Sequence, residues 1–129
     1  MLESYGAARA ARRMTAEGIV ELRRLAEEQY HETLSKTDGY LERVGDLNCQ
    51  FHHRIHEFAA SSRLVTALSS LIEAQLMMKT FETYQDEDLI RSASHHLEIV
   101  RALEARDGDW SAALMRSHIL GARGALRLL

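Results

Sequence analysis

The segment 48–56, Asn-Cys-Gln-Phe-His-His-Arg-Ile-His, holds three of the seven histidines and the only cysteine of the chain. In a helix, side chains four residues apart lie on one face, so Asn48, His52 and His56 would form a single stripe. Phenylalanine and isoleucine residues form an apolar stripe beside it. A row of imidazole and amide groups next to a core-facing row predicts a ligand site inside a helical bundle.

The rest of the chain supplies the elements for such a bundle. Its 129 residues suit a single domain, contain no proline and are rich in good helix formers. Apolar residues recur every three or four positions, which predicts six helices, over about residues 3–13, 15–35, 38–60, 62–83, 89–106 and 110–126. We expect an all-α antiparallel bundle of about six helices, with a metal or effector site in its interior and Asp109 as the N-cap of the last helix.

Charge and composition exclude several classes of function. The formal net charge of −3 gives no electrostatic footprint for nucleic acid. A single cysteine excludes an internal disulfide and fits a reducing compartment. The acidic start resembles no signal peptide, and no stretch reaches the roughly 18 apolar residues of a membrane span. These features predict a cytoplasmic protein with no membrane contact.

Histidines recur on three of the predicted helices. His52 lies on the third, His96 one turn before Val100 on the fifth, and His118 four residues after Leu114 on the sixth. Any one of them is more typical of a surface or hydrogen-bonded core histidine than of a metal ligand. Three imidazoles facing one interior would cost burial free energy unless they were partnered. A metal ion bound by neutral imidazoles is an efficient partner.

Three short patterns surround these histidines. They are Asn48-x-x-Phe51-His52-x-x-Ile55, then Ser92-x-x-His95-His96-x-x-Ile99-x-x-Ala102-Leu103 followed by Ala105-Arg106-Asp107, and finally Met115-x-x-His118-Ile119. In order and spacing the patterns resemble the metal motifs of the FCD domain, the carboxy-terminal effector-binding domain of FadR-type GntR transcriptional regulators. The resemblance extends over essentially the whole chain. It implies one sensor domain over residues 1–129.

The resemblance implies that a divalent metal is held by Asn48, His52, His96 and His118. The family usually has Asp where this chain has Asn48, and a neutral carbonyl donor leaves the charge of the metal less neutralised. His95 replaces a residue that is commonly Glu. It should point about 100° away from His96, which predicts a surface position or a place behind the ligands. Imidazole ligands favour zinc or nickel, with manganese as a further candidate.

His56 stands where the family often has a small residue. Three interpretations stay open: an added metal ligand, a contact to the effector, or a partly exposed histidine. We expect His31 and His53 to face solvent and Cys49 to be a packed bystander.

The resemblance also implies a small organic acid as effector, bound at open positions of the metal, and a homodimer. The winged helix-turn-helix of the family has no counterpart, because no recognition-helix segment precedes Thr15 and the first helix starts abruptly at Leu2. We therefore expect a sensor domain with a truncated first helix. It would contact DNA only through the missing amino-terminal domain.

Two other classes compete with a sensor. A metal-dependent hydrolase could use the same histidines, but the sequence places no general base, and His56-Glu57 is not followed by the second histidine of a zincin motif. A di-iron site would need two Glu-x-x-His motifs, whereas only Glu28 and His31 form one. The remaining alternative is a structural or dimerisation bundle with incidental histidines.

Overall fold

A computed structural model describes residues 2–59 and 84–126 of the protein. These residues confirm the all-α prediction, and none of their helices is long and apolar enough to cross a bilayer. The helix predicted over about residues 62–83 lies outside the described residues. Within them the helices are α1 (Leu2–Arg13), α2 (Ala16–Ser35), α3 (Tyr40–Phe58), α6 (Asp86–Glu104) and α7 (Gly108–Leu126).

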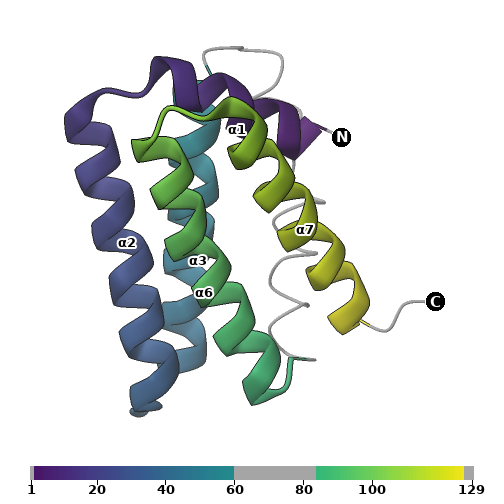
Figure 1. Ribbon diagram of the computed structural model, residues 1–129. Helices are drawn as coiled ribbons and strands as arrows, with labels where there is room; N and C mark the ends of the chain where they lie inside the picture. The colour runs from purple at the N-terminus through teal and green to yellow at the C-terminus, as the bar shows by residue number, and fades with distance from the viewer. Residues whose placement is uncertain (1, 60–83, 127–129) are drawn as a thin grey trace.

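The four longer helices run side by side, and α1 lies across one end of them (Figure 1). Helices α2 and α7 run in one direction, and α3 and α6 in the opposite one. Helix α2 packs against α3 and α6, and α6 packs against α7. Helix α1 contacts α7, α3 and α6. A side chain on the inner face of α1 can therefore reach the space where these three helices meet.

The core is built from the stripes that the periodicity predicts. In α1 the buried residues Ala7, Ala10 and Ala11 are small, so the helix lies close to its neighbours. The larger buried side chains come from the four longer helices, and they are Leu22, Leu25, Phe51, Ile55, Ile99, Val100, Leu103 and Met115. This packing against one shared interior fixes the rotation of each helix about its axis, and with it the direction of every polar side chain on the same stripe.

Caps define two of the helix starts. The Thr15 hydroxyl accepts a hydrogen bond from the Gly18 amide at 3.0 Å, as predicted for the start of α2. The prediction of Asp109 as the cap of the last helix is wrong. Helix α7 begins at Gly108, and the Asp107 carboxylate accepts from the Trp110 amide at 2.9 Å. Arg106, which follows the end of α6, adopts a left-handed φ of 57°. The last helix is therefore capped by Asp107, which precedes the predicted Asp109 in the sequence.

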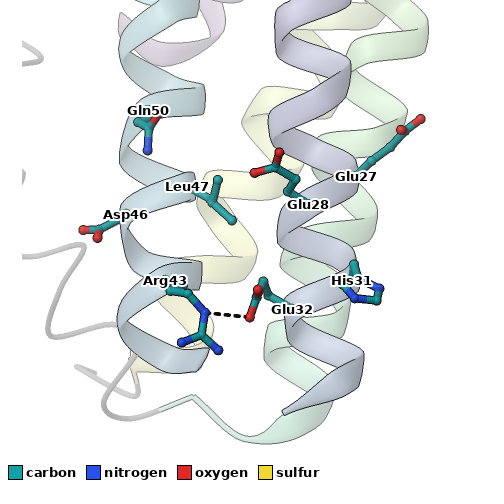
Figure 2. A pocket seen from close by; sticks show the side chains of 8 residues that line it. All are labelled: Glu27, Glu28, His31, Glu32, Arg43, Asp46, Leu47 and Gln50. Atoms are coloured by element: carbon teal, nitrogen blue, oxygen red, sulfur yellow. Dashed lines mark hydrogen bonds and ion pairs between the residues drawn. The ribbon is translucent and has the colours of Figure 1, made fainter. Parts of the chain in front are cut away.

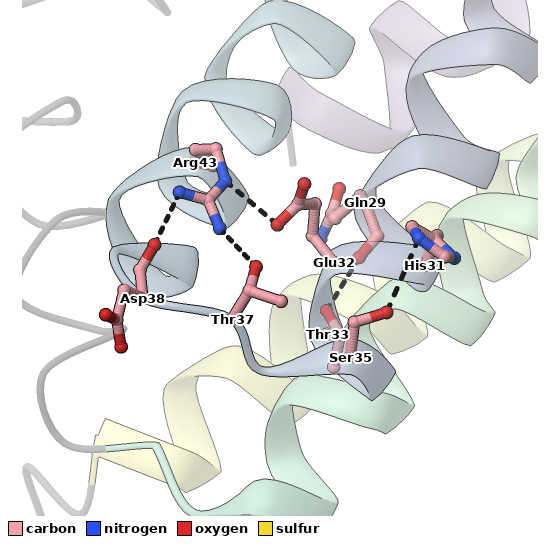
Figure 3. A network of polar contacts seen from close by, with 8 residues as sticks. All are labelled: Gln29, His31, Glu32, Thr33, Ser35, Thr37, Asp38 and Arg43. Atoms are coloured by element: carbon pink, nitrogen blue, oxygen red, sulfur yellow. Dashed lines mark hydrogen bonds and ion pairs between the residues drawn. The ribbon is translucent and has the colours of Figure 1, made fainter.

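The turn between α2 and α3 is held by Arg43 (Figure 3). Its guanidinium donates to the Glu32 carboxylate at 2.9 Å, the Asp38 carbonyl at 2.8 Å and the Thr37 hydroxyl at 2.8 Å. These bonds join the last turn of α2 to the first turn of α3. They keep the two helices antiparallel, and so keep the buried face of α3 directed at the interior.

Candidate metal centre

Three histidines from three helices meet in the interior. His52 of α3, His96 of α6 and His118 of α7 are 2%, 0% and 5% exposed. The Nε2 atom of His118 lies 3.1 Å from Nε2 of His96 and 3.3 Å from Nε2 of His52. The structure therefore brings together the three histidines that the sequence placed on inward stripes. It also points the same ring nitrogen of each toward a common point.

Hydrogen bonds alone cannot satisfy this arrangement. Each nitrogen–nitrogen hydrogen bond needs an N–H on one ring and a lone pair on the other. Nε2 of His118 has either one N–H or one lone pair, so it can satisfy only one of its two neighbours. A cation that accepts a lone pair from each imidazole removes the conflict. With metal–nitrogen bonds of about 2.0–2.1 Å, ligand nitrogens lie about 2.9 Å apart at right angles and about 3.3 Å apart at tetrahedral angles. The two observed separations fit that range, so the residues suit a divalent metal.

Gln29 fixes the tautomer of one of these imidazoles. Its Oε1 atom lies 2.8 Å from Nδ1 of His96, and both residues are fully buried. Because an amide oxygen only accepts, Nδ1 of His96 carries the proton and donates it. The lone pair of His96 is then on Nε2, directed at the other two histidines. The ring of Phe51 stacks on His96 with centroids 4.0 Å apart and planes 7° from parallel, which holds the ring plane.

Burial keeps the imidazoles of His96 and His118 in the form that binds metals. It lowers the pKa of His96 well below its usual value, and the nearby charges of His118 and His52 lower it further. Burial likewise lowers the pKa of His118, with further contributions from neighbouring histidines and from the positive charge of Arg91. Both rings are therefore neutral near pH 7, and a neutral imidazole is the metal ligand.

A carboxylate that the sequence analysis did not single out lies behind His52. Glu3 of α1 is buried, and its Oε2 atom accepts from Nε2 of His56 at 2.9 Å and lies 3.7 Å from Nδ1 of His52. Burial by itself raises the pKa of Glu3, but the interactions of the carboxylate with His52 and His56 outweigh it and leave the pKa lowered. Glu3, His52 and His56 thus form a second cluster that shares one histidine with the first.

The two remaining predicted site residues, Asn48 and His56, lie on the buried face of α3. Asn48 is buried one turn before His52, on the stripe that carries the ligand row. His56 is buried one turn after His52 and is paired with Glu3. His95 is half-buried, with its ring 5.6 Å from that of His118 in an edge-on arrangement. It therefore stands beside a candidate ligand, one of the two positions expected for it.

The residues predicted to lie outside the site are also where they were expected. His31 and His53 are exposed. Cys49 is a half-buried free thiol, and burial raises its pKa, which opposes a role as a nucleophile.

A separate groove of about 500 Å³ lies between α2 and α3 (Figure 2). None of the three converging histidines lines it. Its charged lining is mostly acidic, and Arg43 is already paired with Glu32 at 2.9 Å. A negatively charged groove repels organic acids, so the histidine centre is the better candidate for the site that the sequence predicts.

The lowered pKa values predict how the stability of the metal-free protein depends on pH. In the unfolded chain both histidines titrate near 6.5, whereas His96 and His118 stay neutral to lower pH when folded. Below about pH 6.5 the unfolded chain binds more protons, so the free energy of unfolding should fall as the pH drops. Each histidine contributes up to about 1.4 kcal/mol per pH unit. Above that pH neither histidine contributes a slope.

Urea unfolding of chelator-treated protein between about pH 5 and 8 measures this dependence. His118→Gln should reduce the slope, and His31→Ala, at an exposed position, should leave it unchanged. A free energy of unfolding that stays constant from pH 7 to about pH 5 would contradict the assignment of neutral buried histidines.

Comparisons with known proteins agree with this architecture. The family model described as FCD domain matches residues 1–121. Among curated protein sequences, none matches the chain. Among solved structures, E. coli McbR/YncC superimposes with a TM-score of 0.81 at 18% sequence identity, over 98% of this chain. The chain spans 59% of the length of that structure. At this identity the likeness establishes the fold.

Proposed function

The chain belongs to the FCD domain family, and we propose that within a GntR-type transcriptional regulator it senses a small organic acid through a bound divalent metal. FCD domains of such regulators bind effectors and are not enzymes. The proposal assigns the metal to His52, His96 and His118, with the amide oxygen of Asn48 as the fourth protein ligand. Zinc or nickel suits three imidazoles best, and manganese is the further candidate.

The convergence of three Nε2 atoms carries the metal assignment. The Nε2 atom of His118 lies 3.1 Å from that of His96 and 3.3 Å from that of His52, and burial keeps the rings of His96 and His118 neutral. An apolar core would place no polar nitrogen there, and Nε2 of His118 has only one N–H or one lone pair for two neighbouring nitrogens. The metal would supply a positive charge and open coordination positions at this point.

The charge around the centre supports an anionic effector. Three neutral imidazoles and a neutral amide leave the charge of a divalent ion uncompensated by its protein ligands. Arg91, whose guanidinium also pairs with Asp88 at 3.4 Å, adds a positive charge; after burial, it contributes to the lowered pKa of His95 and His118. Among the described residues, buried nitrogens of Arg91, His95 and His118 lack hydrogen-bond partners. A carboxylate supplies acceptor oxygens for a metal and for such donors.

His56 is the effector contact proposed on α3. Its Nε2 atom donates to Glu3, so an effector would meet the other edge of its ring.

For the whole regulator, we propose a homodimer that contacts DNA through an amino-terminal domain outside the present chain. The organic acid would act by favouring one arrangement of the helices that it bridges.

Thermal unfolding with and without metal tests the proposal. Zinc or nickel should raise the melting temperature, and small mono- and dicarboxylates should raise it further only in the metal-loaded protein. A ligand present at about 100 times its Kd adds about 2.7 kcal/mol to the free energy of unfolding. The corresponding neutral amides are the matched control and should have no effect. Equal stabilisation of metal-free protein by carboxylates would place the effector elsewhere.

A further inference from the structure

Glu3 joins the first helix to a candidate metal ligand. It lies in the first turn of α1, which crosses the end of the bundle and contacts α3, α6 and α7. Both ring nitrogens of His52 face other site residues. Nε2 faces the other two histidines, and Nδ1 lies 3.7 Å from the Glu3 carboxylate.

Two buried atoms at this contact lack partners. Within the part of the chain that the structure describes, Nδ1 of His52 and Oε1 of Glu3 have no hydrogen bond. The Oε2 atom of Glu3 is already held by His56 at 2.9 Å. A separation of 3.7 Å is too long for an N–H···O bond by about 0.5 Å or more. A small movement of Oε2 toward His52 would give Nδ1 of His52 an acceptor.

A metal ion bound to Nε2 of His52 would favour that movement of the Glu3 carboxylate. A neutral imidazole that gives its Nε2 lone pair to a metal carries its proton on Nδ1. The Nδ1–H group then needs an acceptor, and metal-bound histidines nearly always donate it to a carboxylate, a carbonyl or water. Glu3 is the carboxylate in place. Its negative charge also increases the basicity of the ring and hence the strength of the bond to the metal.

We propose that Glu3 is a positioning residue that couples the metal centre to α1. With metal on His52, the Nδ1–H group binds the Glu3 carboxylate and draws the first turn of α1 against α3. His56 holds the same carboxylate oxygen, Oε2, at 2.9 Å and so keeps it beside His52. This inference rests on the proposed metal function. It adds to that function a route by which occupancy of the centre reaches the first helix.

Metal titration and hydrogen exchange on variants of the 129-residue chain test this coupling. Glu3→Gln keeps an acceptor of the same shape but loses the charge, and Glu3→Asp keeps the charge but is one methylene shorter. Glu17→Gln is the matched control, because Glu17 is an exposed acidic residue in the first turn of α2. Competition with a chelating dye measures zinc affinity, and elemental analysis measures zinc stoichiometry. Hydrogen exchange at the amides of residues 6–13 in α1 is measured with and without zinc.

The wild type should bind one zinc per chain, and zinc should slow exchange in α1. Glu3→Gln should bind zinc about 10- to 100-fold more weakly. At saturating zinc, α1 should gain no protection in this variant. Glu3→Asp should show a smaller loss, and Glu17→Gln should behave as the wild type does.

Three results would overturn the inference. Unchanged zinc affinity and unchanged α1 protection in both Glu3 variants would show that the carboxylate is only a packed polar group. Two zinc ions per wild-type chain, falling to one in Glu3→Gln, would make Glu3 a ligand of a second site. A wild-type protein that binds no zinc, nickel or manganese would overturn the proposed function together with the coupling, whereas the first two results leave the metal centre intact.

Discussion

Replacing His96 or His118 by alanine is expected to lower zinc or nickel affinity on the order of 100-fold or more, because each change removes one of three converging imidazoles. Changes in groups that only support a metal ligand already cost about 10- to 100-fold. Competition titration and the metal content after dialysis both measure the effect.

His31→Ala and His53→Ala are the matched controls. Both positions are exposed, so these variants lose an imidazole of the same chemistry outside the centre. Their metal affinity should equal that of the wild type. Because His96 and His118 are buried, circular dichroism of the metal-free variants must first establish that they are folded at the temperature of the titration. An equal loss of affinity in all four variants would mean that the buried cluster does not hold the metal.

Phe51→Ala should produce the largest loss of stability among the core positions around the centre. Phe51 is fully buried, and its ring lies flat against His96 at 4.0 Å. Truncating a buried Phe to Ala costs about 3–5 kcal/mol in transfer free energy and cavity formation. A small domain has only about 5–15 kcal/mol in total. The midpoint of urea unfolding should fall accordingly, and metal affinity should fall with it because His96 loses the surface that orients its ring.

Phe58→Ala provides the comparison, because Phe58 is on the same helix but only partly buried, with Arg54 over its ring. It should cost less than half as much. Phe51→Leu should fall between the two, since it keeps most of the buried apolar volume but not the flat face. A smaller loss for Phe51→Ala than for Phe58→Ala would show that the Phe51–His96 stack does not support the core.

The helices could be predicted because their apolar residues repeat every three or four positions, and that period depends only on helix geometry. Exact starts depend on how the chain turns. Asp107 and Asp109 are both good caps, and the left-handed φ of Arg106 decides between them by turning the chain so that Asp107 meets the Trp110 amide. That conformation is not encoded by the residue type, because Arg rarely adopts a positive φ.

The three histidines could be predicted because each lies on an inward stripe of its own helix. The groups that support them were missed. Gln29 lies on the stripe of Leu22 and Leu25, and Glu3 on that of Ala7, so each is a polar residue at a buried position. That signal was present in the sequence. The partners of Gln29 and Glu3 could not be predicted from the sequence, because these contacts depend on how α1 and α2 meet α3 and α6 in space.

Anomalous diffraction from crystals grown with zinc or nickel, recorded at the absorption edge of the added metal, tests the central claim most directly. We expect one peak per chain, about 2.0–2.1 Å from the Nε2 atoms of His52, His96 and His118. The same map would show whether Asn48 turns its oxygen to the ion. A map without a peak among these three nitrogens, or with its peak at an exposed histidine, would contradict the account.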